Sequence, residues 1–293
     1  MFKSVGLVGN LQKEALLPLC GRIIRWCRRR DIEIYVEKEL YDQLRGGSKK
    51  SDRLTPGRLK DSDLLCVMGG DGFLLHTVRS IYPHKKPLLT VNLGSLGFNS
   101  QAEPAEILKV LKGLYKKKIV SSKRFLLHVT PPRQNADLTS CVALNEVLLI
   151  KETRSRLIHV EVLINDILIG DLACDGIVVS SSTGSTAYNL SSGGPLVYPS
   201  LPVMTITPIC PHTLTFRPIV IPSDTRISLR FLPQKDREEG MICLDGQVWW
   251  PLRHGQEVEI TTAPDPILIA EVHPEQYYAK LRKKLHWGIP FAN

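Results

Sequence analysis

The sequence predicts an open α/β domain with a parallel sheet over residues 1–120 and an all-β, sandwich-like domain over residues 121–270. A closing helical tail, residues 271–293, is expected to pack back on the first domain. Two observations carry this prediction. Short apolar strands alternate with helical patterns in the first part, and helical spacing almost disappears after residue 120, where short alternating strands begin. The length of 293 residues also fits about two domains better than one core.

Strands and helices alternate through the first part of the chain. Apolar runs predict strands at Ser4–Val8, Ile32–Val36, Asp63–Met68 and Pro87–Val91. Apolar residues at helical spacing predict helices over Gln12–Arg30, Phe73–Ile81 and Pro104–Lys118. This order is typical of a parallel sheet covered by helices. Between them, Arg45–Arg58 is polar and basic and contains glycine, which predicts an exposed loop.

The second part has the alternation of half-buried strands. Ile227, Leu229 and Phe231 point to one side, with polar or charged residues between them. Many of the prolines fall between such runs, as expected for short strands joined by turns. At the end of the chain, Glu275–Leu285 returns to helical spacing and predicts the closing helix.

Composition excludes several classes of protein. No apolar run approaches the roughly 18 residues that a membrane-spanning helix needs, and Met1–Asn10 does not have the pattern of a signal peptide. The seven cysteines are irregularly spaced and form no C-x-x-C pair, which favours reduced thiols in a cytoplasmic protein over disulfides or a zinc site. The net charge of +9 fits a nucleic-acid binder or an enzyme with polyanionic substrates. Its tight basic runs, Arg28–Arg30 and Lys116–Lys118, close helical segments, so we interpret them as solvated helix ends and expect no nucleic-acid partner.

A glycine-rich turn, Gly69-Gly70-Asp71-Gly72, follows a buried strand and precedes a helix. The carboxyl end of a strand in an open α/β sheet is where ligands bind, and glycines let backbone N–H groups approach phosphate oxygens. A carboxylate there would repel phosphates unless it binds a cation or accepts a proton from an attacking hydroxyl. The alternative is a tight turn in which Asp caps the helix. Neither a dinucleotide fingerprint nor a P-loop is present.

A polar pair, Asn145-Glu146, interrupts the apolar run Ala143–Leu149. Burying an amide and a carboxylate without partners costs several kcal/mol. The pair therefore predicts either a bulge or strand end facing solvent, or a ribose-binding site. In the second case the glutamate accepts two hydroxyl hydrogen bonds and the asparagine faces a base edge.

The longest polar segment runs from Asp175 to Pro195 and is dense in hydroxyls and glycine. Hydroxyls and small residues can wrap a pyrophosphate or ribose, and Tyr188 could stack on a ring; an ordinary Ser/Thr/Gly loop is the alternative. The segment has no G-x-S-x-G, so it does not suggest a hydrolase nucleophile. Two weaker signals are Asp245-Gly246-Gln247, which by itself is a hairpin turn, and His76, which lies about one helical turn beyond Asp71 and either reaches the site or is a packed residue.

Together these segments resemble the NAD kinase family of bacterial type. The resemblance rests on their order and spacing over nearly the whole chain: GGDG (69–72), VNLGSLGF (91–98), NE (145–146), DGIVVSSSTGSTAYNLSSGGPLVYPS (175–200), PICPHTL (208–214), RPIVIP (217–222), DGQ (245–247) and KLHWG (284–288). It implies a kinase that transfers the γ-phosphate of ATP to the 2′-hydroxyl of the adenosine ribose of NAD. Members often bind NAD across a subunit interface, so a homo-oligomer, dimer or tetramer, is also implied.

The resemblance also implies roles for single residues. Asp71 is expected to be the base, and Gly69, Gly70 and Gly72 to hold phosphates. Asn145 and Glu146 are expected on the ribose and base, and Asp175 at the nicotinamide end. Further contacts with the nucleotide are expected from His76, Arg156, Thr186, Ala187, Tyr188, Asn189, Leu190, Ser191 and Gln247. A divalent cation, Mg²⁺, is expected to be held mainly by the triphosphate.

Two positions depart from the family pattern, and other readings stay open. Phe73 replaces the Thr, Ser or Asn that commonly follows GGDG, and Ala173 replaces a basic residue two positions before the Asp of the DG segment. Lipid kinases and phosphofructokinase-like enzymes share the phosphate turn but are not expected to share TGSTAY or DGQ. A non-catalytic NAD-binding regulator has no need of Asp71 beside phosphates. The residues are compatible with ATP or polyphosphate as donor and with NAD or NADH as acceptor.

Overall fold

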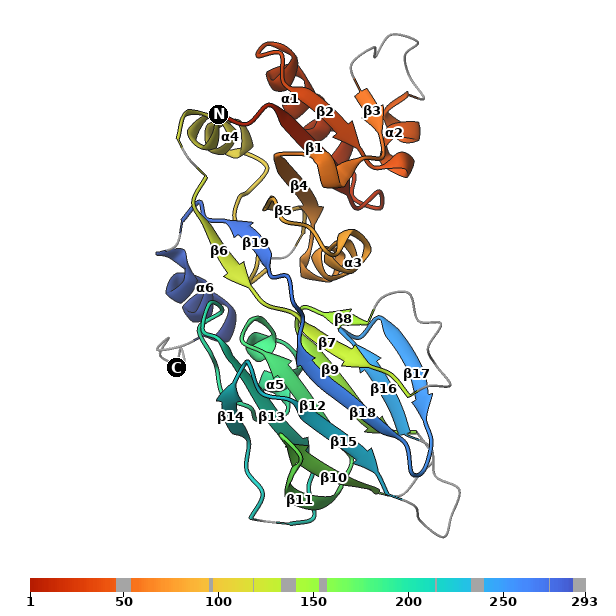
Figure 1. The fold of residues 1–293 in the computed structure, drawn as a ribbon. Coiled ribbons are helices and arrows are strands. Elements are labelled where there is room, and N and C mark those ends of the chain that lie inside the picture. The colour runs from red at the N-terminus through yellow and green to blue at the C-terminus, as the bar shows by residue number, and fades with distance from the viewer. Residues whose placement is uncertain are drawn as a thin grey trace. The chain divides into compact units, whose positions relative to one another are not determined.

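The computed structural model describes residues 1–45, 54–94, 97–117, 119–132, 141–152, 157–213, 215–232, 240–273 and 275–286. They form two compact units, one made of residues 1–123 with 267–293 and one made of residues 124–266. Figure 1 labels their helices and strands. None of the helices in the described parts of the chain combines the length and the apolar character that crossing a membrane requires.

The first unit is built on a seven-stranded sheet in the order β3-β2-β1-β4-β5-β19-β6. Its strands are β1 (Ser4–Gly9), β2 (Glu33–Val36), β3 (Leu54–Pro56), β4 (Leu64–Gly69), β5 (Pro87–Asn92), β6 (Ser121–Arg124) and β19 (Ile267–Ala270). The pairs from β3 through β19 are parallel. The predicted α/β unit with a parallel sheet is therefore confirmed.

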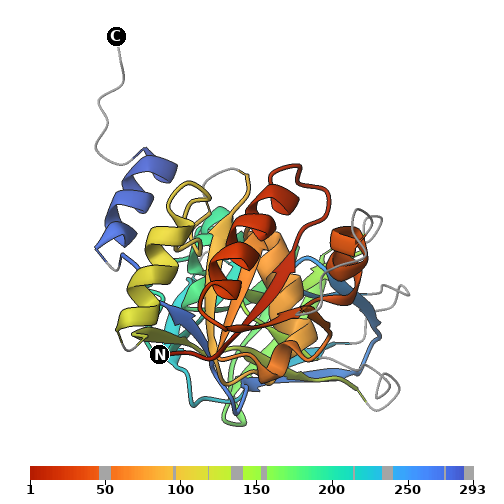
Figure 2. The same cartoon turned by 90° about the horizontal axis from the view of Figure 1, so that it is seen from above.

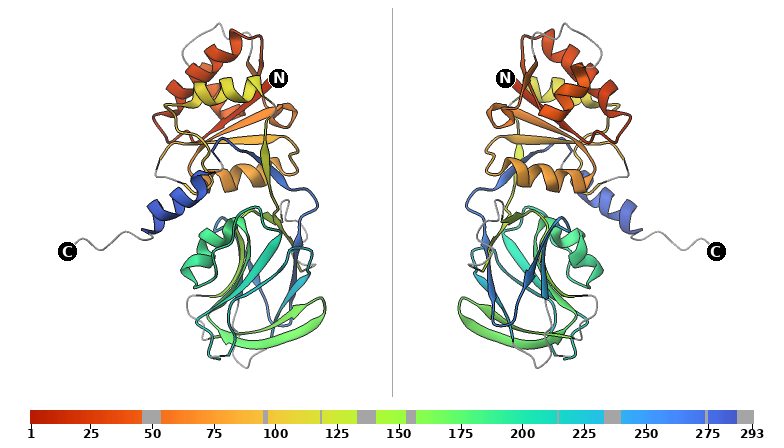
Figure 3. Two further views of the ribbon diagram at one scale, coloured as in Figure 1. Left: turned by 90° about the vertical axis from the view of Figure 1, so that its left-hand side faces the viewer. Right: turned by 90° about the vertical axis from the view of Figure 1, so that its right-hand side faces the viewer.

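Helices cover both faces of this sheet. The helices of this unit are α1 (Leu16–Arg28), α2 (Lys38–Arg45), α3 (Asp71–Ile81), α4 (Ile107–Lys116) and α6 (Gln276–Leu285), together with the short 3₁₀ helix η1 (Leu59–Asp61). The apolar sides of α1 and α4 share one core with the sheet, through residues such as Ile23 and Ile107. Helix α3 lies on the opposite face of the sheet (Figures 2 and 3). The turn that starts α3 is therefore set between sheet and helix, at the carboxyl edge of β4.

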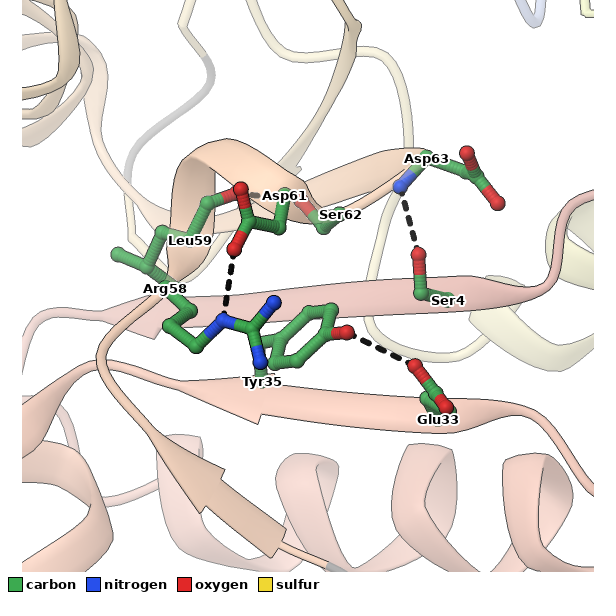
Figure 4. Close-up of polar contacts among 8 residues, drawn as sticks. All are labelled: Ser4, Glu33, Tyr35, Arg58, Leu59, Asp61, Ser62 and Asp63. Atoms are coloured by element: carbon green, nitrogen blue, oxygen red, sulfur yellow. Dashed lines mark hydrogen bonds and ion pairs between the residues drawn. The ribbon is translucent and has the colours of Figure 1, made fainter.

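The opposite, amino-terminal edge of the sheet is held by polar contacts (Figure 4). The Ser4 hydroxyl accepts the Asp63 N–H at 2.9 Å and so joins the starts of β1 and β4. Arg58 Nε donates to Asp61 at 2.7 Å, and its guanidinium lies 5.5 Å from the Tyr35 ring centre. The predicted loop Arg45–Arg58 is thus partly wrong, because Leu54–Pro56 forms strand β3 beside β2. Its residues 46–53 lie outside the described parts of the chain.

The second unit is an antiparallel sandwich of two six-stranded sheets. One has the order β11-β10-β15-β18-β7-β8 and the other β14-β13-β12-β9-β16-β17. The strands are β7 (Leu127–Thr130), β8 (Val142–Ala143), β9 (Glu146–Lys151), β10 (Ile158–Ile164), β11 (Ile167–Cys174), β12 (Gly176–Ser181), β13 (Val203–Ile209), β14 (Ile219–Pro222), β15 (Ile227–Phe231), β16 (Gly240–Leu244), β17 (Val248–Leu252) and β18 (Glu257–Thr262). Alternate residues of both sheets, such as Val160, Leu229 and Leu149, fill the core between them. The predicted β-rich domain is confirmed.

Two connections within the units bear on the site. The chain leaves one sheet of the sandwich at β8 and enters the other at β9, across Leu144 and Asn145. After β12 it forms the 3₁₀ helix η3 (Thr183–Thr186) and the short helix α5 (Tyr188–Ser191). Strand β19, which the sequence placed in the β domain, belongs to the first unit because it pairs in parallel with β5. Lys280 and Lys284 attach α6 to the same unit, through the Ser100 carbonyl and the Phe98 ring.

Candidate functional site

The glycine-rich turn joins β4 to α3 at the carboxyl edge of the parallel sheet. Gly70 is the N-cap of α3, and its carbonyl accepts the N–H groups of Phe73 and Leu74 at 3.1 Å each. Gly69 has no room for a side chain, since a Cβ there would lie 2.8 Å from Phe73. A helix N-terminus carrying small residues is suited to bind an anion.

The Asp71 carboxylate is held in place by a loop distant in sequence. Its Oδ2 accepts the Phe98 N–H at 2.9 Å and its Oδ1 accepts the Asn99 N–H at 3.3 Å. A Cβ at Gly97 would come within 2.4 Å of Oδ1, so the loop approaches this closely only with glycine there. The side chain remains half-buried rather than sealed. Phe98 is the last residue of the motif at residues 91–98, and its N–H, with that of Asn99, orients Asp71.

His76 lies on the exposed side of α3 beside Phe73. The two rings are nearly parallel, at 26°, with their centres 6.5 Å apart. Phe73 therefore lies between Gly69 and His76, in place of the small polar residue that the family commonly has. The His76 ring thus lies beside Phe73, the residue that directly follows the glycine-rich turn.

In the second unit, Asp245 holds the bend between the two sheets. Asp245 and Gly246 have positive φ values of 52° and 69° and close the β16–β17 hairpin, as the D-G signal predicted. The buried carboxylate also accepts the N–H groups of Leu144 at 2.9 Å, Asn145 at 2.8 Å and Glu146 at 3.2 Å. Gln247, predicted from this motif to contact the nucleotide, is exposed at the hairpin. The role of Asp245 in holding the bend was not predicted from the sequence, where the only indication is its place in the Asp245-Gly246-Gln247 motif.

The polar pair on the bend is buried with unused hydrogen-bonding atoms. Asn145 and Glu146 are each 7% exposed. Among the described residues, Asn145 Oδ1 and Glu146 Oε2 have no hydrogen-bond partner. A buried polar atom left in this way costs about 1–3 kcal/mol, which a protein tolerates where a ligand supplies the partner. The alternative of a solvent-facing bulge is therefore wrong.

The charge state of Glu146 follows from its surroundings. Burial, and secondly the Asp245 carboxylate, raise the pKa of Glu146 to about 8, although the Tyr188 N–H donates to this side chain and opposes the rise. At neutral pH the group is therefore mostly a neutral acid that can donate one hydrogen bond and accept others. A ligand hydroxyl that donates to the carboxylate would favour the ionised form.

The hydroxyl-rich loop after β12 packs onto the same bend. Ser181 Oγ donates to the Leu144 carbonyl at 2.5 Å and accepts the Gly184 N–H at 3.1 Å. A Cβ at Gly184 would lie 2.1 Å from the Asn145 carbonyl oxygen. Ser182 and Ser185 are fully buried and bond to backbone carbonyls. These serines therefore build the support of the site, contrary to the idea that they wrap a pyrophosphate.

The predicted residues of α5 divide into two groups. Asn189 is fully buried, its Oδ1 accepts the hydroxyls of Thr205 and Thr207, and its Nδ2 donates to backbone carbonyls. This side chain is thus saturated inside the unit and fixes α5 on β13. The second group keeps side-chain surface accessible to a ligand and consists of the partly buried or exposed residues Thr186, Ala187, Tyr188, Leu190 and Ser191. The Tyr188 N–H brings this group to Glu146.

Asp175 is not brought to this group within the chain. It precedes β12, whereas Glu146 pairs with Ser180 near the other end of that strand. Five residues of strand correspond to about 17 Å. Asp175 instead forms an ion pair of 2.6 Å with Lys151. Arg156 lies outside the described residues, which also contain no group of three or more His, Cys, Asp or Glu able to hold a metal ion.

The comparisons with known proteins agree with this arrangement. The models of the ATP-NAD kinase N-terminal domain and C-terminal domain match residues 5–119 and 144–272. The NAD kinase of Moorella thermoacetica is 35% identical over 290 residues, which is 98% of this chain and 90% of that protein. That of Geotalea daltonii is 32% identical over 287 residues, which is 98% of this chain and 99% of that protein.

Solved structures share the fold. Yeast NADH kinase complexed with NADH superposes with a TM-score of 0.86 at 23% identity, over 99% of this chain and 89% of that one. An NAD kinase from Archaeoglobus fulgidus in complex with ATP gives a TM-score of 0.72 at 20% identity, over 97% and 98%.

Fold and site together define a phosphotransferase with nucleotide substrates. The chain belongs to the NAD kinase family, whose reaction phosphorylates NAD to NADP with ATP. The resemblance in the sequence is thereby confirmed.

The raised pKa of Glu146 predicts a pH-dependent stability. Between its ordinary value of 4.5 and about 8, the folded chain retains a proton that the unfolded chain has released. The free energy of unfolding contributed by this group is therefore complete below pH 4.5 and falls as pH rises towards 8. Glu146→Gln abolishes this titration, so its melting temperature relative to the wild type should rise between pH 5 and 9. Glu14→Gln, at an exposed position, is the control; an unchanged difference between Glu146→Gln and the wild type across this range would contradict the account.

Proposed function

We propose that this chain transfers the γ-phosphoryl group of ATP to the 2′-hydroxyl of the adenosine ribose of NAD, with Asp71 as the general base. The observation that carries the proposal is the Asp71 carboxylate, held by the Phe98 and Asn99 N–H groups at the N-terminus of α3. A carboxylate placed among phosphate-binding groups has a use only if it handles a proton or a cation.

The contacts of Asp71 support this role in proton transfer. Each carboxylate oxygen accepts one backbone N–H and keeps a lone-pair position for a substrate hydroxyl. As the hydroxyl oxygen forms its bond to the γ-phosphorus, its proton passes to Asp71 and the bond to the β-phosphate oxygen breaks, which releases ADP. Because the N–H donors fix the carboxylate, little reorganisation is needed when it reacts.

The remaining roles follow from the other contacts. Gly70 and Gly72, at the start of α3, would hold phosphate oxygens with backbone N–H groups and the positive end of the helix. Glu146 Oε2 and Asn145 Oδ1 would accept ribose hydroxyl and base N–H groups of NAD, which removes the cost of their burial. Tyr188, 41% exposed, and its neighbours on α5 would line the same pocket. We assign Asn189 to positioning α5.

Mg²⁺ fits these residues as a cation carried by the triphosphate. Magnesium prefers phosphate oxygens, waters and one or two carboxylates over an all-protein cage, and the described residues offer Asp71 but no cluster of three such groups. When bound, the ion neutralises phosphate charge. We also propose a cytoplasmic location, which is supported by the lack of any disulfide among the seven cysteines, all of them described.

We further propose a homo-oligomer in which Asp175 of one copy serves the site of another. The support is its place about 17 Å along β12 from the residue that pairs with Glu146. Its side chain, paired with Lys151, is half-buried and so keeps part of the carboxylate accessible.

Asp71→Asn removes the base but keeps the shape of the side chain. We expect kcat to fall by roughly 10²–10⁴-fold, with the Kd for NAD changed little. Turnover is measured with NAD, ATP and Mg²⁺ by coupling NADP to an NADP-specific dehydrogenase, and NAD binding by calorimetry. Asp42→Asn, an exposed carboxylate on α2, is the control. Near-normal turnover in Asp71→Asn would remove Asp71 from its role.

A mixed oligomer tests the shared site. Asp71→Ala and Asp175→Asn are each expected to be nearly inactive alone. When the two are co-expressed with different tags and purified as a hybrid, one site of the pair regains both intact residues, so up to half of the wild-type activity should return. A hybrid as inactive as its parents, or a monomer in sedimentation, would show that Asp175 does not act across a subunit interface.

A further inference from the structure

An exposed tryptophan shares the face of the sheet on which Glu146 lies. In the sheet containing β9, β16 and β17, residues Val147, Leu149, Ile242, Leu244 and Trp250 point into the core of the sandwich. Successive side chains of a strand alternate between faces. Glu146, Leu148, Cys243 and Trp249 therefore point to the opposite face, which we call the outer face.

Trp249 lies on the same outer face as Glu146, two strands away. It pairs with Cys243 on β16, and Cys243 pairs with Leu148 on β9, two residues along from Glu146. The offset is thus two strands, about 10 Å across the sheet, and about 7 Å along it. The distance between backbones is of the order that a nucleoside, ribose with base, together with an indole ring would fill.

The surroundings of Trp249 fix its indole while leaving it accessible. The side chain is 49% exposed. Its Nε1–H points to the Gly246 carbonyl at 3.4 Å, in the turn whose Asp245 carboxylate binds the backbone of Asn145 and Glu146. Hydrogen bonds of the Asp245-Gly246 turn therefore connect the Trp249 ring with the backbone of Glu146, whose Oε2 has no partner among the described residues. Tryptophan, which combines a large apolar ring with a polar N–H, is enriched at binding interfaces.

We propose that Trp249 is a substrate-binding residue whose indole stacks on a base of NAD while Glu146 binds the adjoining ribose. The inference rests on the proposed function and adds to it a stacking surface that the sequence motifs did not identify. Stacking of a base on an aromatic side chain is worth enough to weaken binding roughly tenfold when the ring is removed. Because the ring contacts no reacting atom, it contributes to affinity and not to the chemical step.

The test compares Trp249→Ala with Trp249→Phe and with Val220→Ala, an exposed residue on β14 at the opposite edge of the same sheet. We expect Trp249→Ala to raise the KM and Kd for NAD roughly tenfold, with kcat and the KM for ATP nearly unchanged. Trp249→Phe should retain most of the affinity. NAD should quench tryptophan fluorescence in the wild type, and much less in Trp249→Phe.

The outcomes separate this inference from the proposed function. If Trp249→Ala, with an unchanged melting temperature, keeps the wild-type Kd for NAD, the stacking role is overturned while the kinase assignment stands. A loss confined to ATP or to kcat would also overturn it. If the wild type makes no NADP from NAD and ATP, the proposed function itself fails, whatever Trp249 does to NAD binding.

Discussion

The arrangement of the second unit depends on one buried carboxylate. Where the chain passes from β8 in one sheet to β9 in the other, the N–H groups of Leu144 and Asn145 face away from ladder partners, and buried N–H groups need acceptors. Asp245 supplies them, from a hairpin about a hundred residues further along the chain. Its own N–H donates to the Glu146 carbonyl, so hairpin and bend form one unit.

The same contact creates the chemical character of the site. Burial, and secondly the Asp245 charge that this contact sets beside Glu146, raise the pKa of Glu146 to about 8. Ser181 and Gly184 close over the bend from the other side. A dinucleotide that donates hydroxyl hydrogens to Glu146 would supply the hydrogen bonds that this side chain lost when folding buried it. In the first unit, the loop at Gly97–Asn99 performs a similar task for Asp71. In each unit, backbone N–H groups thus hold a carboxylate in a fixed position: Asp71 in the first and Asp245 in the second.

Much of the fold could be predicted from local pattern, and the remainder depends on contacts between distant residues. The parallel strands and the sandwich strands show clear apolar periodicity, and the Asn145-Glu146 pair stands out because it interrupts an apolar run. Strand β19 could not be assigned to the first unit, since only its pairing with β5 decides this. The short β3 has little pattern of its own. The sequence of Ser180–Ser185 is the same whether its hydroxyls face a ligand or a backbone carbonyl. Only the burial of these side chains in the structure shows that they face backbone carbonyls. Asp245 looked like a plain turn residue because its partners lie about a hundred positions earlier in the chain.

The central claim is that Glu146 is a buried, protonated acid in the free protein and binds the hydroxyl groups of a ligand. The most direct measurement is an NMR titration of the Glu146 carboxyl carbon in ¹³C-labelled protein, assigned by Glu146→Gln, without and with saturating NAD. The account predicts a pKa near 8 in the free protein, and a lower pKa once ribose hydroxyls donate to the carboxylate. A Glu146 that titrates near the ordinary glutamate value of 4.5 in the free protein, or whose titration is unaffected by bound NAD, would contradict it.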